Sequence, residues 1–243
     1  MRRSERDELR DVVVGDNMIK LVFFDIGGTL VGSNNLFSYL AEKLGRKSDQ
    51  SLEKFLSSRF AEIYANANPP RFKTVVQMIA ELLVLASVEF DLEDLSRLAG
   101  EFYNDLFVDK AWLLDGAKKN LEFMKKNDVK LIVASDADSN ALFRELKLLG
   151  IYDFFDHFII SSEVGAYKPS DPFVNQAKKY CEGINKREIY FVGDNKVDMV
   201  SAKKLGIISI LLNASKIPTE TKPDFIFKDL NELFNFWKNE FEK

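Results

Sequence analysis

The sequence predicts an α/β protein with a doubly wound parallel sheet and an inserted helical domain. Continuous apolar runs alternate with helical patterns along most of the chain. The first run is followed by a long stretch that has helical periodicity and no convincing strand. Residues that can carry chemistry follow several runs directly, and ligands of open α/β sheets bind at the carboxyl ends of strands.

The apolar runs predict strands that are buried on both faces, because they do not alternate with polar residues. Helical patterns lie between the later runs, and several of them end at a glycine, which is a common helix stop. The expected strands are "IKLVFF" (19–24), "KLIVAS" (130–135), "HFIIS" (157–161), "EIYFVG" (188–193), "IISILL" (207–212) and "FIF" (225–227).

The segment from 34 to 110 predicts a helical cap domain inserted after the first strand. Apolar residues recur on one helix face in "FKTVVQMIAELLVLA", and the same spacing runs from Leu52 to Ile63. "DLEDLSRLAGEFYNDLF" indicates a further helix, with Asp91 as its N-cap and Asp94 in the capping-box position. The core domain is then expected over 18–33 and 111–243, and residues 1–17 form a weakly specified extension.

The composition limits which partners and which catalytic residue types can be expected. The net charge of −4 gives no reason to expect nucleic acid or an anionic membrane as a partner, and no apolar stretch is long enough to span a bilayer. A single cysteine, Cys181, excludes an internal disulfide and indicates a reducing, cytoplasmic setting. The single histidine, His157, largely excludes histidine triads and histidine metal clusters. Carboxylates, hydroxyls and lysine must therefore carry any chemistry.

Asp25 in "LVFFDIGGTL" is the first candidate site residue. The apolar run before it places the carboxylate at a strand tip, and Gly27 and Gly28 let backbone N–H groups approach an anion closely. An aspartate there can attack phosphorus and form an acyl-phosphate. The motif is equally consistent with a strand that ends in a turn capped by Asp25.

Three later strand tips offer further candidates, each with an ordinary alternative. Ser135 could hold a phosphate oxygen, although it or Asp138 could simply cap the next helix. Lys168 in "SSEVGAYKPS" could bind phosphate as a point charge, or be a surface lysine. Asp194 and Asp198 in "YFVGDNKVD" suit Mg²⁺, or Asp194 caps a helix while Asp198 faces solvent.

The order of these motifs resembles the haloacid dehalogenase-like hydrolase superfamily, over nearly the whole chain from about Ile19 to Lys243. The matching pieces are "FFDIGGTL", "LIVAS", "SSEVGAYKPSDPFV" and "FVGDNKVDMVSAKKLGI". The helical insert after the first motif resembles the branch of phosphoglycolate phosphatases and dehalogenases. The resemblance implies a Rossmann-like core with an α-helical cap.

The resemblance also implies roles for the candidate residues. Asp25 would be the nucleophile, while Ser135 and Lys168 would bind the phosphoryl group and stabilise the charge that develops on it. Mg²⁺ would be bound by Asp25, Asp194 and the backbone carbonyl of Gly27, with Asp198 supporting it. The implied substrate is a small phosphorylated metabolite, and the expected phosphate neighbours are Gly27, Gly28, Ser135, Asp136 and Lys168.

Gly27 departs from the pattern, because phosphatases of this family usually carry a second aspartate there. That aspartate protonates the leaving alcohol and then activates water, and such help contributes about 10²–10⁴-fold. A cap residue, an ordered water, Asp136 or Asp138 could serve instead. A substrate with a good leaving group would need no acid for the first step.

Two other readings remain open. Dehalogenases and phosphonoacetaldehyde hydrolases of the superfamily also lack the second aspartate, but dehalogenases use no Mg²⁺, and retention of Asp194 and Asp198 does not favour them. Phosphonate hydrolases use a cap lysine, and none of the cap lysines lies in an apolar setting; they are Lys43, Lys47, Lys54 and Lys73. The chain could also be a degenerate phosphate-ligand or protein-binding member. The sequence favours a Mg²⁺-dependent phosphatase and leaves monomer and homodimer open.

Overall fold

The computed structural model describes residues 19–213 and 222–242. The extension expected over residues 1–17 lies outside this part of the chain. None of the helices in the described residues is both long enough and apolar enough to cross a membrane.

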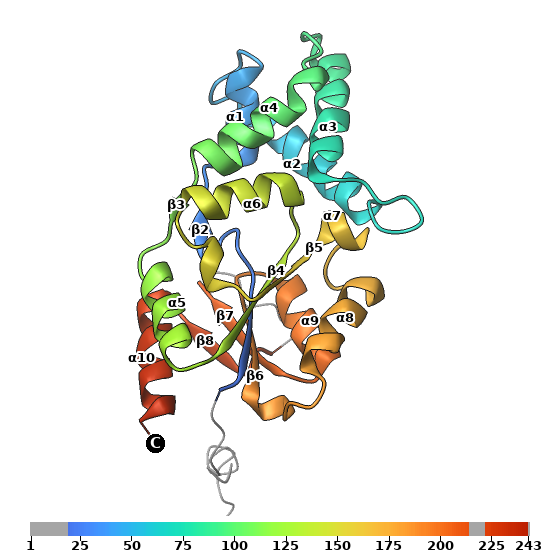
Figure 1. Ribbon diagram of the computed structural model, residues 1–243. Coiled ribbons are helices and arrows are strands. Elements are labelled where there is room, and N and C mark those ends of the chain that lie inside the picture. Colours follow the sequence, from blue (N-terminus) through green and yellow to red (C-terminus); the bar gives the residue numbers. More distant parts are fainter. Residues whose placement is uncertain (1–18, 214–221, 243) are drawn as a thin grey trace, which may run out of the picture.

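Six parallel strands form the central sheet, in the order β5-β4-β1-β6-β7-β8 (Figure 1). The predicted α/β fold class is therefore confirmed, and each expected run contains a strand with ends shifted by no more than a few residues. The strands are β1 (Leu21–Phe24), β4 (Lys130–Ser135), β5 (His157–Ile160), β6 (Ile189–Gly193), β7 (Ile208–Leu212) and β8 (Phe225–Phe227).

Helices cover both faces of this sheet, which explains why its strands have no polar face. Val22 and Phe24 of β1 pack on the side of α5 (Ala117–Lys126), α6 (Ser139–Leu148) and α10 (Leu230–Phe241). Leu21 and Phe23 point to the other side, where α8 (Asp171–Lys178) and α9 (Lys196–Leu205) pack (Figure 1). Burial on both faces requires the continuous apolar runs seen in the sequence.

The segment after β1 forms a separate helical layer over the carboxyl ends of the strands (Figure 1). It has its own apolar core, to which residues of all its helices contribute. We propose that this cap domain spans 34–110, since two short strands not predicted from the sequence, β2 (Val31–Gly32) and β3 (Trp112–Leu113), pair antiparallel where the chain enters and leaves it. Its helices are α1 (Leu36–Lys43), α2 (Gln50–Ala65), α3 (Val75–Phe90), α4 (Ala99–Asn104) and the π-helical turn η2 (Asp105–Asp109).

The prediction that a helix begins at Asp91 is wrong. Asp91 ends α3 in a left-handed conformation with φ 51°, and helical structure resumes only at the 3₁₀ turn η1 (Ser96–Leu98). Aspartate tolerates the left-handed region better than most residues, so it can end a helix as well as begin one. Asp94 does cap locally, since its carboxylate accepts a hydrogen bond from the Ser96 N–H at 2.8 Å.

The strand order brings the predicted site residues to one place. From β1 the sheet grows through β4 to β5 on one side, and through β6 to β7 and β8 on the other. The order therefore reverses next to β1, and ligands of open α/β sheets bind in the crevice at such a switch point. β1 ends just before Asp25, β4 ends at Ser135, and β6 ends just before Asp194.

The core holds the start of α3 through two side chains. Asp138 occupies the N-cap position of α6, yet its two carboxylate oxygens accept hydrogen bonds from the N–H groups of Val75 and Val76, each at 2.9 Å. The hydroxyl of Tyr167 donates to the carbonyl of Lys73 at 2.7 Å. The capping role considered for Asp138 thus falls on a helix of the cap domain, not on the helix that follows it in sequence.

We expect Asp138→Ala to lower the free energy of unfolding by about 1–2 kcal/mol, because two partly buried N–H groups at the start of α3 lose their acceptor. Chemical denaturation measures this loss. Asp138→Asn keeps one acceptor oxygen and should lose less. A stability of Asp138→Ala equal to that of the wild type would show that this contact does not hold the cap on the core.

Candidate active site

A cavity of about 360 Å³ lies between the carboxyl ends of the strands and the cap. Core and cap both line it, the cap through Val75 and the aromatic side chains of Tyr64, Tyr103 and Phe107. Its charged lining residues are Asp25, Asp136, Glu145, Lys168, Asp194 and Asp198. All the charged site residues predicted from the sequence are therefore brought together, and Glu145 joins them without having been predicted.

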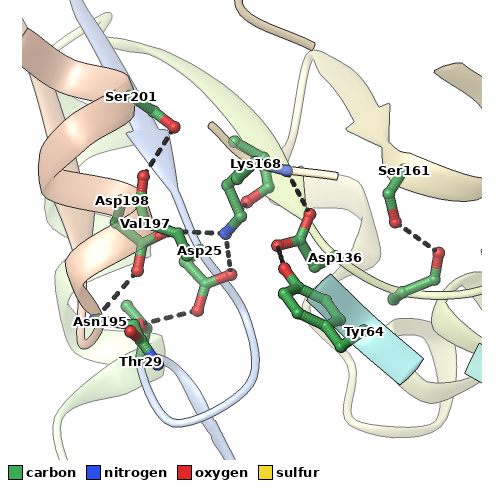
Figure 2. A network of polar contacts seen from close by, with 12 residues as sticks. Asp25, Thr29, Tyr64, Asp136, Ser161, Lys168, Asn195, Val197, Asp198 and Ser201 are labelled. Carbon is green, nitrogen blue, oxygen red and sulfur yellow. Dashed lines mark hydrogen bonds and ion pairs between the residues drawn. The ribbon is translucent and has the colours of Figure 1, made fainter. Parts of the chain in front are cut away.

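Asp25 is fixed by a hydrogen bond to each of its carboxylate oxygens. Oδ1 accepts from Lys168 Nζ at 2.7 Å, and Oδ2 accepts from the Thr29 hydroxyl at 3.1 Å (Figure 2). Thr29 is fully buried four residues further on, in the loop that follows β1. It belongs to the predicted motif but was assigned no role; the structure shows that it orients the carboxylate.

Lys168 lies in the loop between α7 (Ser161–Val164) and α8, and only 3% of it is exposed. Its ammonium group donates to Asp25 Oδ1, to Asp198 Oδ1 at 2.6 Å and to the carbonyl of Ala134 at 3.0 Å. Burial alone would lower the pKa of Lys168, but the charges of Asp198 and Asp25 outweigh it and hold that pKa well above its usual value. The alternative of a surface lysine is therefore excluded.

Asp25, Asp194 and Asp198 form an acidic cluster in which one oxygen of each lies within 4.8 Å of the others. Burial, and then the charge of Asp25, raises the pKa of Asp194 to about 6. Burial raises the pKa of Asp198 to about 8 although Lys168 opposes the shift. A divalent cation bound by the oxygens of Asp194 and Asp198 would oppose both shifts, because its charge favours the ionised form of a carboxyl group.

The geometry also excludes the ordinary alternatives for Asp194 and Asp198, which were a helix cap and a solvent-facing side chain. Asp198 is 1% exposed rather than solvent-facing, and its Oδ2 accepts from the N–H of Asn195 at 3.1 Å (Figure 2). The N-cap of α9 is Asn195, not Asp194. The side chain of Asp194 is therefore not used to cap the helix that follows it.

The glycines of the site have separate roles. Gly28 has a φ of +78°, and a Cβ there would overlap the carboxylate of Asp194. Gly193 likewise leaves room for Asp198. Gly27 lines the cavity, its φ lies outside the left-handed region, and a Cβ would meet nothing within 4 Å. A side chain is thus sterically possible at 27 and not at 28.

Ser135 and Asp136 lie at the end of β4. Ser135 is 4% exposed and lines the cavity. Asp136 accepts a hydrogen bond on each oxygen, from the Lys168 backbone N–H at 2.9 Å and from the hydroxyl of Tyr64, on α2 of the cap, at 2.9 Å (Figure 2). Asp136 therefore ties the lysine loop to the cap rather than pointing freely into the cavity.

Glu145 is the site residue that the sequence analysis missed. It lies on α6, three residues after Leu142 and one before Leu146, both buried, so that it falls on the apolar face of the helix. It is 8% exposed, and no described residue is a hydrogen-bond or ion-pair partner of its carboxyl group, whose pKa is affected only by burial and the charge of Asp25. Burial, followed by the charge of Asp25, raises the pKa of Glu145 to about 8. A single acidic residue within a helix's apolar stripe was the available signal.

Residues 19–206 match the family described as haloacid dehalogenase-like hydrolase. Because this match covers most of the chain, the protein belongs to that family of hydrolases. The predicted resemblance is therefore confirmed.

Curated relatives are similar to this chain over most of their length, and solved structures share its fold. A phosphoglycolate phosphatase of Haemophilus influenzae is 23% identical over 223 residues, which are 90% of this chain and 98% of that protein. A magnesium-bound structure of the HAD-hydrolase YfnB from Bacillus subtilis, described as revealing interdomain movement, has a TM-score of 0.73 at 16% identity and covers 90% of this chain and 99% of its own. The L-2-haloacid dehalogenase of Xanthobacter autotrophicus has a TM-score of 0.70 at 21% identity, with 91% and 99% covered.

The glycine pair offers a matched test of the cluster. We expect Gly28→Ala to lower the free energy of unfolding by roughly 1–2 kcal/mol from the left-handed backbone alone, and to displace Asp194. Mn²⁺ titration should then show weaker metal binding. Gly27→Ala has neither the strain nor the overlap and serves as the control. Equal metal affinity in the two variants would contradict the role given to Gly28.

Glu145 makes stability depend on pH in a defined direction. Its pKa is raised from 4.5 to about 8, so the folded chain keeps a proton that the unfolded chain has lost, and stability falls as pH rises between these values. Glu145→Gln removes this dependence. The difference in unfolding free energy between the Glu145→Gln variant and the wild type, measured without metal, should therefore shift by a few kcal/mol in favour of the variant between pH 5 and pH 8. Glu163→Gln, at an exposed position, should show no such trend. A difference independent of pH would show that Glu145 is not buried as its acid.

Proposed function

We propose that the protein is a Mg²⁺-dependent phosphatase that hydrolyses a small phosphate monoester through an aspartyl-phosphate on Asp25. The observation that supports this most strongly is the charge of the cavity. Among the described residues that line it, five carry carboxyl groups, four of them aspartates, and Lys168 is the only cation. A phosphate dianion would be repelled from this lining unless a divalent cation neutralised the acidic cluster.

The residues fit such a cation. Mg²⁺ prefers oxygen ligands and usually keeps several waters, and Asp25, Asp194 and Asp198 offer closely spaced carboxylate oxygens. We propose Asp25, Asp194 and the carbonyl of Gly27 as its ligands, with Asp198 supporting the site. When bound, it would offset negative charge on the phosphoryl oxygens.

The chain's own residues suit attack on phosphorus. Thr29 and Lys168 hold the two oxygens of Asp25, so the carboxylate is already oriented before a substrate binds. Attack would place the leaving oxygen on the side of phosphorus opposite Asp25, as in-line displacement requires. Lys168 and the hydroxyl of Ser135 would then bind the equatorial phosphoryl oxygens, and water would hydrolyse the intermediate.

The cap would determine which substrate fits. Its aromatic residues line the cavity, and a volume of about 360 Å³ suits a small molecule. The Haemophilus influenzae relative is named for phosphoglycolate, which is a small phosphate monoester. We propose a substrate of this size. We also propose that the protein is cytoplasmic, because a chain with a single cysteine suits a reducing compartment.

The competing hydrolase chemistries find less support. A cap lysine for Schiff-base chemistry would have to reach the cavity, but neither the four lysines considered above nor Lys110 at the end of the cap is among the described residues that line it. Three of the four form ion pairs elsewhere, Lys43 with Asp105, Lys47 with Glu42 and Lys73 with Glu81. The dehalogenase neighbours share the fold at 22% identity or less, which says nothing of the reaction of this chain.

Turnover of an activated aryl phosphate tests the proposal. We expect turnover that requires added Mg²⁺ and falls by several orders of magnitude in Asp25→Asn, because an amide cannot form the acyl-phosphate. Asp153→Asn, at an exposed position, is the matched carboxylate-to-amide control. Tight Mg²⁺-dependent binding of a phosphate analogue without turnover would favour a binding protein, and halide release from a 2-haloacid without Mg²⁺ would favour a dehalogenase.

A further inference from the structure

The site needs a proton donor that Gly27 cannot provide. When the bond from phosphorus to an alkyl oxygen breaks, the leaving oxygen must gain a proton, and a positioned acid accelerates this step by about 10²–10⁴-fold. The donor must face the same cavity as Asp25, on the side away from its carboxylate. It must also hold its proton near neutral pH.

The acids considered from the sequence are engaged elsewhere. Both oxygens of Asp138 accept hydrogen bonds from the N–H groups of Val75 and Val76. One oxygen of Asp136 accepts a hydrogen bond from the backbone N–H of Lys168, and the other accepts one from the hydroxyl of Tyr64. Burial raises the pKa of both carboxyl groups although these hydrogen bonds oppose the shift, so they differ from a free acid in their geometry: each oxygen is already an acceptor, and Asp138 does not line the cavity.

Glu145 differs from them in its surroundings. It lies on α6, between the sheet and the cap (Figure 1), and lines the same cavity as Asp25 and Gly27. It is 8% exposed and has no hydrogen-bond or ion-pair partner among the described residues. Its carboxyl oxygens are not among the fully buried polar atoms without a partner in the described residues, so they reach the cavity, while burial of the side chain as a whole favours the neutral acid.

We propose that Glu145 supplies the acid–base function that Gly27 lacks, protonating the leaving-group oxygen and then deprotonating the attacking water; this rests on the proposed phosphatase function. In the first step, an Asp25 oxygen bonds to phosphorus, the bond to the alkyl oxygen breaks, and the alcohol departs with the Glu145 proton. In the second step, water attacks phosphorus and its proton passes to Glu145. Asp25 leaves as a carboxylate, phosphate is released, and both groups return to their initial states.

The ionisable groups around the cavity are consistent with this cycle. They come from the chain directly after β1 (Asp25), β4 (Asp136) and β6 (Asp194), from the loop before α8 (Lys168), from α9 (Asp198), and from the cap (Tyr64 and Tyr103). The raised pKa of Glu145, about 8, keeps it protonated at pH 7 in the resting site. Loss of the proton during the first step leaves a carboxylate that is more basic than an ordinary glutamate. It can therefore accept a proton from the attacking water in the second step.

Comparing Glu145→Gln with the wild type on two esters tests the proposal. Rapid quenching measures alcohol release in the first turnover, once with an aryl phosphate and once with an alkyl ester such as glycerol phosphate. Glutamine keeps the size but has no acidic proton. We expect alkyl release to slow by about 10²–10⁴-fold, while aryl release changes little because phenolate leaves without a proton.

The aryl ester should also report the second step. Without the base, the variant should release one equivalent of phenol per active site rapidly and then stall with phosphorylated enzyme. Glu163→Gln, at an exposed position, should match the wild type on both esters. Gly27→Asp added to Glu145→Gln should restore alkyl release, because a side chain at 27 meets no neighbour within 4 Å.

The outcomes separate the two proposals. If wild-type turnover of both esters is absent or does not depend on Asp25, the phosphatase function fails, and the role of Glu145 with it. If the wild type is an Asp25-dependent phosphatase and Glu145→Gln slows both first steps equally, or neither, the phosphatase stands and the role of Glu145 is overturned. A melting temperature at least equal to that of the wild type would exclude misfolding as the cause of any loss.

Discussion

The ammonium group of Lys168, buried between Asp25 and Asp198, is the interaction on which the site depends. It joins the loop before α8 to the tip of β1, to α9 and, through the carbonyl of Ala134, to β4. Removing it would leave buried carboxylates without a counter-charge, which is far more costly than losing an exposed ion pair. The strand order of the sheet has to bring these elements together before the lysine can bind them.

This constraint explains the two glycines that closely approach the acidic cluster. Asp194 and Asp198 can come near Asp25 only because Gly28 and Gly193 have no side chains to occupy the same space. Gly27 has no such steric reason, since the space beside it is open. Its lack of a carboxylate is therefore a chemical difference from the family pattern and not a requirement of packing. In the account proposed here, the nucleophile and charge stabilisation stay on the strand tips, while proton transfer moves to a helix beneath the cap.

Local sequence patterns predicted the fold and predicted that the residues at the strand ends would lie together, because both follow from short-range rules. Buried strands need continuous apolar runs, and the strand tips of a parallel sheet meet at one edge. Contacts between distant segments were not accessible in this way. Asp138 looked like the cap of its own helix but bonds to α3 some sixty residues earlier in the chain, and Asp136 bonds to Tyr64 of the cap. Asp91 could begin or end a helix, and its backbone decides for the end. Glu145 was overlooked although its position in an apolar stripe marked it as buried.

The central claim is that Asp25 becomes covalently phosphorylated, and mass spectrometry of the quenched enzyme tests it most directly. The protein is mixed with an aryl phosphate and Mg²⁺, quenched in acid within the first turnovers, digested and mapped. The account predicts one phosphoryl group, on the peptide that contains Asp25, and its absence without Mg²⁺. Turnover with no phosphorylated peptide, or with the phosphoryl group on another residue, would contradict it.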